Sequence, residues 1–103
     1  MSELTNDQYE SWTGLLEKEL VKKYRHSRRN LDNDNPVFNL GDIRRKTSED
    51  GFGIESIDGE LLRNTLSQYA QTTNRISINF QKGTFQLTEE GKRRMVELDP
   101  QIL

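Results

Sequence analysis

Hydrophobic residues in the first third of the chain recur at three- and four-residue steps, the spacing of one face of an α-helix. This apolar stripe consists of Tyr9, Trp12, Leu16, Leu20 and Tyr24. Thr5, followed three residues later by Gln8, forms a capping-box pattern just before it. The pattern predicts a helix over about 6–26, whose stripe faces either the core of the chain or a second copy of it.

The middle of the chain predicts two further helices. Residues 30–36 are rich in Asn and Asp and end in a proline, so they form a loop. A short extended piece over 37–39 and a helix over about 40–48 follow, and the two glycines of 51–56 indicate a connection. The most clearly amphipathic helix is expected over 58–72. Its apolar face consists of Ile57, Leu61, Leu62, Leu66, Tyr69 and Ala70.

Alternation of apolar and polar residues over 76–87 predicts a β-hairpin. A two-residue loop at Lys82 and Gly83 would place the apolar side chains of both strands on one buried face. The facing pairs would then be Phe80 with Phe85 and Ile78 with Leu87. Because Lys is not ideal at the first position of a type I′ turn, a three-residue loop with a bulge at Gly83 is the competing geometry.

The stretch after the hairpin predicts an abrupt start of a closing helix. Thr88 supplies a capping oxygen, and Glu89 and Glu90 occupy the first turn, where the helix dipole favours negative charge. Pro100 is placed to end this helix. The residues expected on its inward side are Gly91, Met95 and Leu98.

The composition describes one small domain with a limited core. Of 103 residues, 31% are hydrophobic and 31% charged, and the mean hydropathy is -0.93. We therefore expect a single domain over 1–103, and a homodimer with Trp12, Leu16 and Leu20 in a shared interface is possible. The absence of Cys excludes disulfides and thiolate metal sites. No segment resembles a signal peptide or a membrane span, so a soluble, cytoplasmic protein is expected.

Charge is segregated along the chain although its net value is only -2. Basic residues cluster over 22–29, 44–46 and 92–94, and acidic residues cluster over 32–34, 49–60 and 89–90. Any attraction of nucleic acid must therefore be local. The cluster Lys22 to Arg29 is either a solvated helix end or a nucleic-acid contact, and the sequence leaves both open.

The chain shows no arrangement of residues typical of an enzyme, a cofactor site or a metal site. His26 is the only histidine and has no companion ligands, which argues against a metal site or a histidine-based triad. The glycines at 51 and 53 follow no strand and lack the third glycine of a nucleotide-binding fingerprint. We therefore expect no enzymatic activity, no cofactor and no small-molecule ligand.

The order of expected elements, together with the stretch "FQLTEEGKRRM" at 85–95, resembles the winged helix-turn-helix family over about 37–98. The resemblance implies a small α+β fold, mostly helical, with a two-stranded hairpin as the wing. It also implies that 58–72 is the recognition helix and 76–87 the wing of a small transcription regulator. The partner implied is double-stranded DNA.

The same resemblance assigns roles to particular residues. It places Arg63, Asn64, Ser67 and Gln68 toward the major groove, Lys82 at the wing tip near the backbone or minor groove, and Arg44, Arg45 and Lys46 on phosphates. These residue types suit the roles, because Arg pairs bidentately with guanine while Asn and Gln pair with adenine. Glu60 lies on the reading face and the connection before that helix is acidic, which keeps open an alternative: a winged-helix protein–protein interaction module that does not bind DNA.

Overall fold

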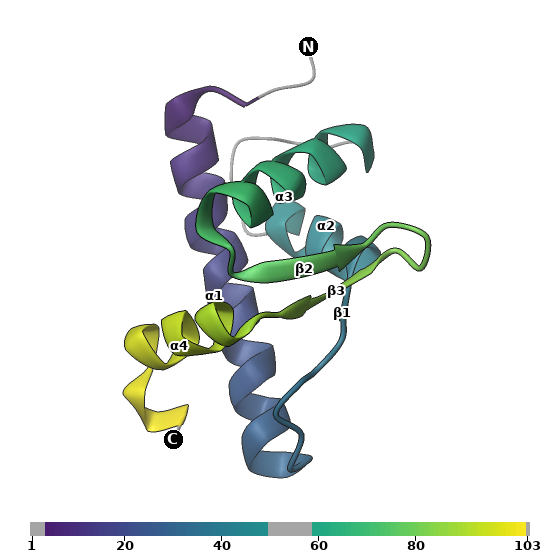
Figure 1. The fold of residues 1–103 in the computed structure, drawn as a ribbon. Coiled ribbons are helices and arrows are strands. Elements are labelled where there is room, and N and C mark those ends of the chain that lie inside the picture. Colours follow the sequence, from purple (N-terminus) through teal and green to yellow (C-terminus); the bar gives the residue numbers. More distant parts are fainter. Residues whose placement is uncertain (1–3, 50–58, 103) are drawn as a thin grey trace.

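The computed structural model describes residues 4–49 and 59–102, with the side chains of 4–45 and 59–102 (Figure 1). The elements in chain order are α1 (Asn6–Asn30), β1 (Phe38–Asn39), α2 (Leu40–Glu49), α3 (Gly59–Thr73), β2 (Ile76–Asn79), β3 (Thr84–Leu87), α4 (Glu89–Leu98) and the 3-10 turn η1 (Pro100–Ile102). The described part is thus mixed helix and antiparallel sheet, as an α+β fold requires. Ile57 and the connection predicted over 51–56 lie outside the described residues.

The first helix begins where the sequence predicts and ends later. The Gln8 amide donates to the Thr5 hydroxyl at 3.2 Å and the Thr5 amide donates to the Gln8 side chain at 3.0 Å, so the capping box is confirmed. The helix continues to Asn30 rather than ending near residue 26. Its last turn is held by Ser27, whose hydroxyl donates to the Asn33 carbonyl at 2.6 Å.

The apolar stripe of α1 forms the core of the single chain. Trp12, Leu16 and Leu20 are each 0% exposed and Tyr24 is 1% exposed, whereas Tyr9 is half-buried. They share one cluster with apolar residues of the other helices and the sheet. The expectation that Trp12, Leu16 and Leu20 form a shared interface is therefore wrong, because these side chains are already covered by their own chain. Pairing of two chains stays a prediction that these side chains no longer motivate.

The sheet has three strands in the order β1-β3-β2, all antiparallel, rather than the two expected. β1 joins it because Phe38 lies opposite Phe85, and the two rings stack with centroids 5.1 Å apart. The predicted hairpin is confirmed, but its register is not the predicted one. The facing pairs are Ile76 with Leu87, Ile78 with Phe85 and Asn79 with Thr84.

A four-residue loop, Phe80 to Gly83, explains the different register. Gly83 has a φ of +66°, which favours glycine, and its amide donates to the Phe80 carbonyl at 3.3 Å. The Asn79 side chain accepts from the Lys82 amide at 3.2 Å. Both expected loop geometries are wrong, and Phe80 leaves the buried face and is 40% exposed.

The start of α4 is hydrogen-bonded to the connection between α3 and β2. Thr88 caps α4 by accepting from the Gly91 amide at 3.1 Å, as predicted, and its own amide donates to the Arg75 carbonyl at 3.0 Å. Gly91 and Met95 are buried, as expected. Leu98 is 44% exposed, contrary to expectation, because α4 ends there and η1 brings Ile102 into the core instead.

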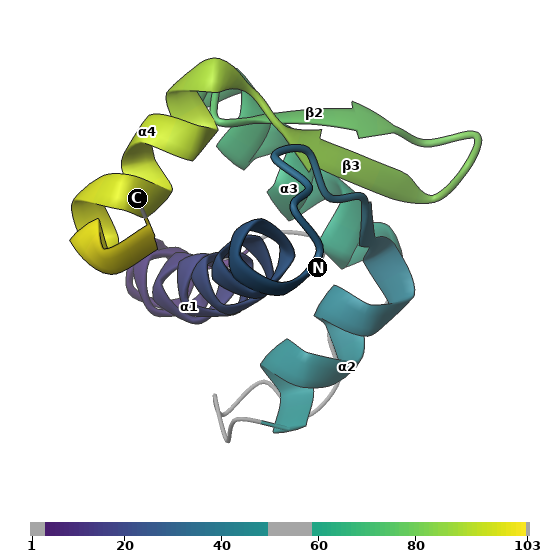
Figure 2. The same cartoon turned by 90° about the horizontal axis from the view of Figure 1, so that it is seen from below.

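α1 is the helix around which the other elements pack. α2, α4 and η1 contact it, and Figure 2 shows α2 and α4 on different sides of it. The sheet lies against α3, and the tip of the β2–β3 loop extends to one edge of the molecule in both views (Figures 1 and 2). Among the described helices, none is long and apolar enough to cross a bilayer.

Candidate nucleic-acid interface

α3 presents a polar face opposite its core residues. Leu62, Leu66 and Tyr69 are buried. Arg63, Asn64 and Gln68 are exposed and Ser67 is half-buried. The helical period thus places the four residues assigned to base contacts on one accessible face, and their contact with DNA stays a prediction.

Three cations from different elements gather around one open pocket of about 320 Å³. Arg44 comes from α2, Arg63 from α3 and Lys82 from the β2–β3 loop. Asn39, Leu40, Gly41, Gly59, Leu62 and Gly83 complete the lining. This arrangement brings together cations that lie up to 38 residues apart in the sequence (82 − 44).

Backbone contacts fix this pocket. The Leu40 amide donates to the Gly83 carbonyl at 3.0 Å, which holds the hairpin loop against the start of α2. The Asn39 side chain caps α2 by accepting from the Gly41 amide at 2.8 Å. Since α2 begins at Leu40 and α3 at Gly59, the positive ends of two helix dipoles border the pocket and add to its cations.

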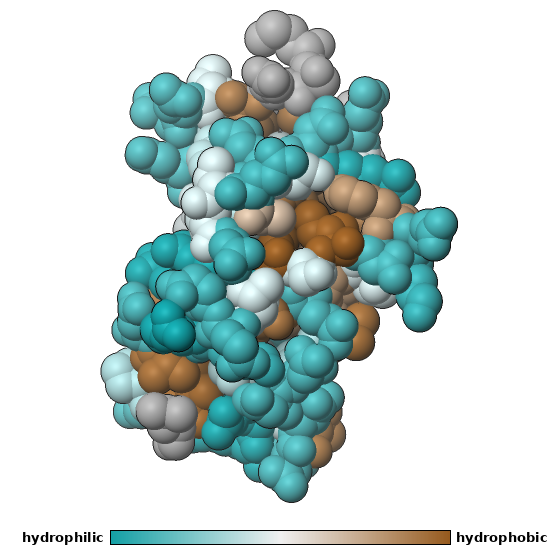
Figure 3. All heavy atoms as spheres, in the orientation of Figure 1, coloured by the Kyte–Doolittle hydropathy of each residue, from teal (hydrophilic) through white to brown (hydrophobic). Residues whose placement is uncertain are grey.

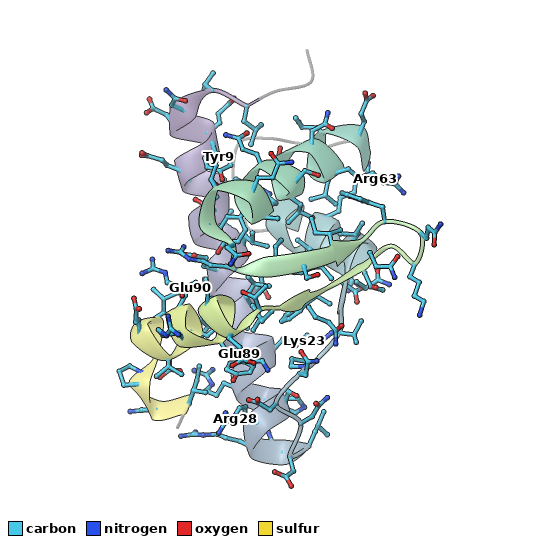
Figure 4. All side chains as sticks on the ribbon, viewed as in Figure 1. Tyr9, Lys23, Arg28, Arg63, Glu89 and Glu90 are labelled. Atoms are coloured by element: carbon cyan, nitrogen blue, oxygen red, sulfur yellow. The ribbon has the colours of Figure 1, made fainter. Side chains whose placement is uncertain are left out.

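Arg63 extends from α3 toward the hairpin (Figure 4). Its guanidinium carbon lies 5.8 Å from the centroid of the Phe80 ring, within range of a cation–π contact. No acidic side chain among residues 4–45 and 59–102 pairs with Arg63 or Lys82. Glu60, in the first turn of α3, is exposed and is the nearest acid in sequence to this face.

Of the two phosphate-assigned residues whose side chains are described, only Arg44 lies at the pocket. Arg44 lines the pocket, whereas Arg45 is 63% exposed outside its lining and lies 3.5 Å from the Asp42 carboxylate. Lys46 belongs to α2, and its side chain lies outside the described part of the chain.

The basic cluster Lys22 to Arg29 is largely engaged within the chain. Arg25 pairs with Asp99 at 2.8 Å. Lys23 donates to the Val37 carbonyl at 2.7 Å, and Arg29 donates to the Gln101 carbonyl at 3.0 Å. These contacts explain the cluster as a structural part of α1 and leave it little free charge for nucleic acid.

Asp34 forms ion pairs with two further cations, one from α1 and one from α4. It accepts from the Tyr24 hydroxyl at 2.8 Å, pairs with Arg28 at 2.8 Å and pairs with Lys92 at 3.2 Å. The Tyr24 hydrogen bond, followed by those from Lys92 and Arg28, holds the pKa of the Asp34 carboxyl below its usual value. Its contribution to stability is therefore present at neutral pH and is lost as the pH falls through that lowered pKa.

A charged cluster around the buried Glu17 is the main feature that the sequence analysis missed. The Glu17 carboxylate accepts from the Tyr69 hydroxyl at 2.7 Å, from Arg75 at 2.6 Å and from Arg94 at 3.3 Å. Burial, and then the bond to Glu17, raise the pKa of Tyr69 well above its usual value. The one available signal was the position of Glu17 directly beside Leu16 on the buried side of α1.

The described residues were also compared with the requirements of a metal site. They contain no group of three side chains placed to hold a metal ion. Within residues 4–45 and 59–102, Arg63 and Lys82 lie near one pocket and neither pairs with an acidic side chain. Comparison with protein families, with curated proteins and with solved structures found no match, so the function is inferred from the geometry of this chain.

Proposed function

We propose that this protein is a small winged helix-turn-helix regulator that binds double-stranded DNA. In this proposal α3 enters the major groove and the β2–β3 loop lies against the adjacent backbone. The order α2, α3, β2, β3, α4 supports it, because it matches the order expected from the resemblance. An α-helix also fits the width of the major groove.

One observation carries the proposal: Arg44, Arg63 and Lys82 converge on a single pocket. The chain has a net charge of -2, so a general attraction to DNA is not available to it. Because the basic clusters at 22–29 and 92–94 are mostly paired within the chain, attraction is concentrated at this face. DNA carries its charge on phosphates, and a local group of cations is what binds them.

The contacts divide by chemistry. Arg63, Asn64 and Gln68 carry the donors and acceptors that read base edges, and they share the exposed face of α3. Arg44 and Lys82 border the pocket and suit phosphates, which fix register without reading sequence. Sequence preference should therefore depend on α3, and the salt dependence of affinity on the pocket.

Arg63→Ala tests the reading role. We expect it to weaken binding to the preferred duplex by about 1 to 3 kcal/mol and to relax the preference at one base pair. Fluorescence anisotropy with a preferred and a mutated duplex, at two salt concentrations, measures both effects. Arg93→Ala is the matched control, because Arg93 is also an exposed helical arginine but pairs with Glu90 on α4. Equal losses in the two variants would contradict the assignment of the interface to α3.

Lys82→Ala tests the phosphate role and should behave differently. We expect weaker binding to all sequences alike, with the slope of log affinity against log salt reduced by about one unit. An unchanged slope, or a loss confined to one sequence, would exclude this role. The side chain is exposed in the loop, so folding should be unaffected.

Glu60→Gln probes repulsion on the same face. Removing this exposed carboxylate should strengthen DNA binding at low salt, and the gain should fade as salt screens the charges. Anisotropy titrations across a salt series measure it. Glu97→Gln is a control on α4, where Glu97 lies 3.6 Å from Arg94. A gain of the same size from Glu97→Gln would assign the effect to net charge rather than to the α3 face.

A second candidate function is docking of a partner protein on the hairpin. Val37 is 51% exposed and Phe80 is 40% exposed, and both line a second open pocket of about 620 Å³ beside the hairpin. Figure 3 shows hydrophobic surface at the level of the hairpin within a mostly hydrophilic face. Absence of DNA retardation by the wild-type protein at low salt would favour this candidate.

A further inference from the structure

We propose that Phe80 positions Arg63 for bidentate pairing with a guanine base. Phe80 would then determine sequence preference without itself making a hydrogen bond to DNA. The inference rests on the proposed DNA binding. It adds that the protein reads guanine at one position and that Phe80 makes this reading selective.

The first observation is the place of Phe80. The register of the hairpin puts Phe80 in the loop, beyond the last facing pair, Asn79 with Thr84. The buried face of the hairpin is filled without it, by Ile76, Phe85 and Leu87. Phe80 is 40% exposed in a chain whose apolar residues are few. The core therefore does not explain why a large aromatic ring stands there.

The second observation is the contact that the ring makes. The guanidinium carbon of Arg63 lies 5.8 Å from the ring centroid. A guanidinium that lies over an aromatic face keeps the N–H donors at its edge available, and these donors match the O6 and N7 acceptors of guanine. Among the described residues no carboxylate takes those donors. The contact thus restrains Arg63, and no carboxylate of residues 4–45 and 59–102 occupies its N–H donors.

The third observation is that the loop carrying the ring is itself fixed. The Gly83 amide donates to the Phe80 carbonyl at 3.3 Å, and the Leu40 amide donates to the Gly83 carbonyl at 3.0 Å. The backbone that carries the ring is therefore held at the start of α2, and Leu40, Gly83 and Arg63 of α3 line the same pocket. A free arginine loses rotamer freedom when it binds, and a side chain that is already held loses less, so part of the cost of binding is removed beforehand.

The experiment is selection of bound duplexes from a random pool by the wild-type protein and by Arg63→Ala, Phe80→Leu and Phe80→Tyr. We expect the wild type to prefer guanine at one position and Arg63→Ala to lose that preference. Phe80→Leu should reduce it by about two- to fivefold, the size of an exposed cation–π contact, whereas Phe80→Tyr should retain it. The salt dependence of affinity should be unchanged in Phe80→Leu, because no charge is removed.

Thermal unfolding of each variant separates positioning from folding, and Leu98→Ala is the control for loss of an exposed apolar side chain away from the interface. A loss confined to the guanine position, with an unchanged melting temperature, supports the inference. A loss spread equally over all sequences overturns it, as does a full guanine preference in Phe80→Leu. A wild-type protein that retards no duplex at low salt overturns the proposed function instead.

Discussion

Gly91→Ala is expected to lower the free energy of unfolding by about 3 kcal/mol, the upper range for an overpacked site. A Cβ at this position would lie 1.9 Å from the carbonyl oxygen of Arg75 and 2.9 Å from its carbonyl carbon. Both atoms are backbone, and the oxygen also accepts the Thr88 amide at 3.0 Å. The contact therefore cannot be relieved by turning a side chain, and α4 must move away from the connection between α3 and β2.

Thermal and urea denaturation followed by circular dichroism measure this loss, which corresponds to a fall in Tm of about 12 to 24 °C for a domain of this size. Gly14→Ala is the matched control. Gly14 is exposed within α1, and a Cβ there would meet nothing within 4 Å. It should stabilise the protein by up to about 1 kcal/mol through helix propensity alone. A Gly91→Ala protein with an unchanged Tm would contradict the close packing of α4 on Arg75.

Glu17→Ala is expected to cost about 2 to 3 kcal/mol of stability, since it removes a carboxylate that serves three donors. Its side chain is 11% exposed, while Arg75 and Arg94 are 27% and 31% exposed. Without Glu17 the Tyr69 hydroxyl, which is buried, loses its acceptor and the two arginines lose their counter-charge. The partial exposure of the arginines keeps the cost below that of a fully buried pair.

Urea denaturation of Glu17→Ala, Glu17→Gln and Glu90→Ala separates the contributions. Glu17→Gln keeps one side-chain acceptor without the charge and should fall between the wild type and Glu17→Ala. Glu90→Ala removes the 46%-exposed partner of Arg93 and should cost at most about 1 kcal/mol, as surface pairs do. The Glu17 effect should persist at high salt because buried charges are screened less. Equal effects of Glu17→Ala and Glu90→Ala would contradict the buried cluster.

Helix starts that are marked by capping residues were predictable from the sequence. The register of the hairpin was not, because it depends on contacts between distant segments. The capping residues Thr5 and Thr88 mark helix starts that the structure confirms. The predicted hairpin register differs from the observed one by two residues. A shift of two residues leaves every side chain on the same face, so the apolar pattern fits both registers equally well. Only the loop distinguishes the two registers, and in it Gly83 has a positive φ and accepts a hydrogen bond from Leu40 of α2, a contact between segments far apart in the sequence.

The candidate site was predictable only in part, for a related reason. The helical period alone places Arg63, Asn64 and Gln68 on an exposed face. It cannot tell that Arg44 and not Arg45 borders the pocket, because this depends on how α2 is rotated against α3. The helical period also does not distinguish a stripe that faces the core, as in α1, from one that faces a second chain, because the spacing of apolar residues is the same in both cases.

The contacts of α1 with α4 and the C-terminal residues after it affect the chain while it is being synthesised. Arg25 contacts Asp99 across 74 residues, Arg29 contacts Gln101 across 72, and Glu17 contacts Arg94 across 77. At translation rates of about 5 to 20 residues per second, α1 is made about 4 to 15 seconds before these partners. During that interval the apolar side of α1 has no cover from α4. A ribosome stalled before α4 therefore carries a helix whose apolar side is incompletely covered, and such exposed surface favours aggregation.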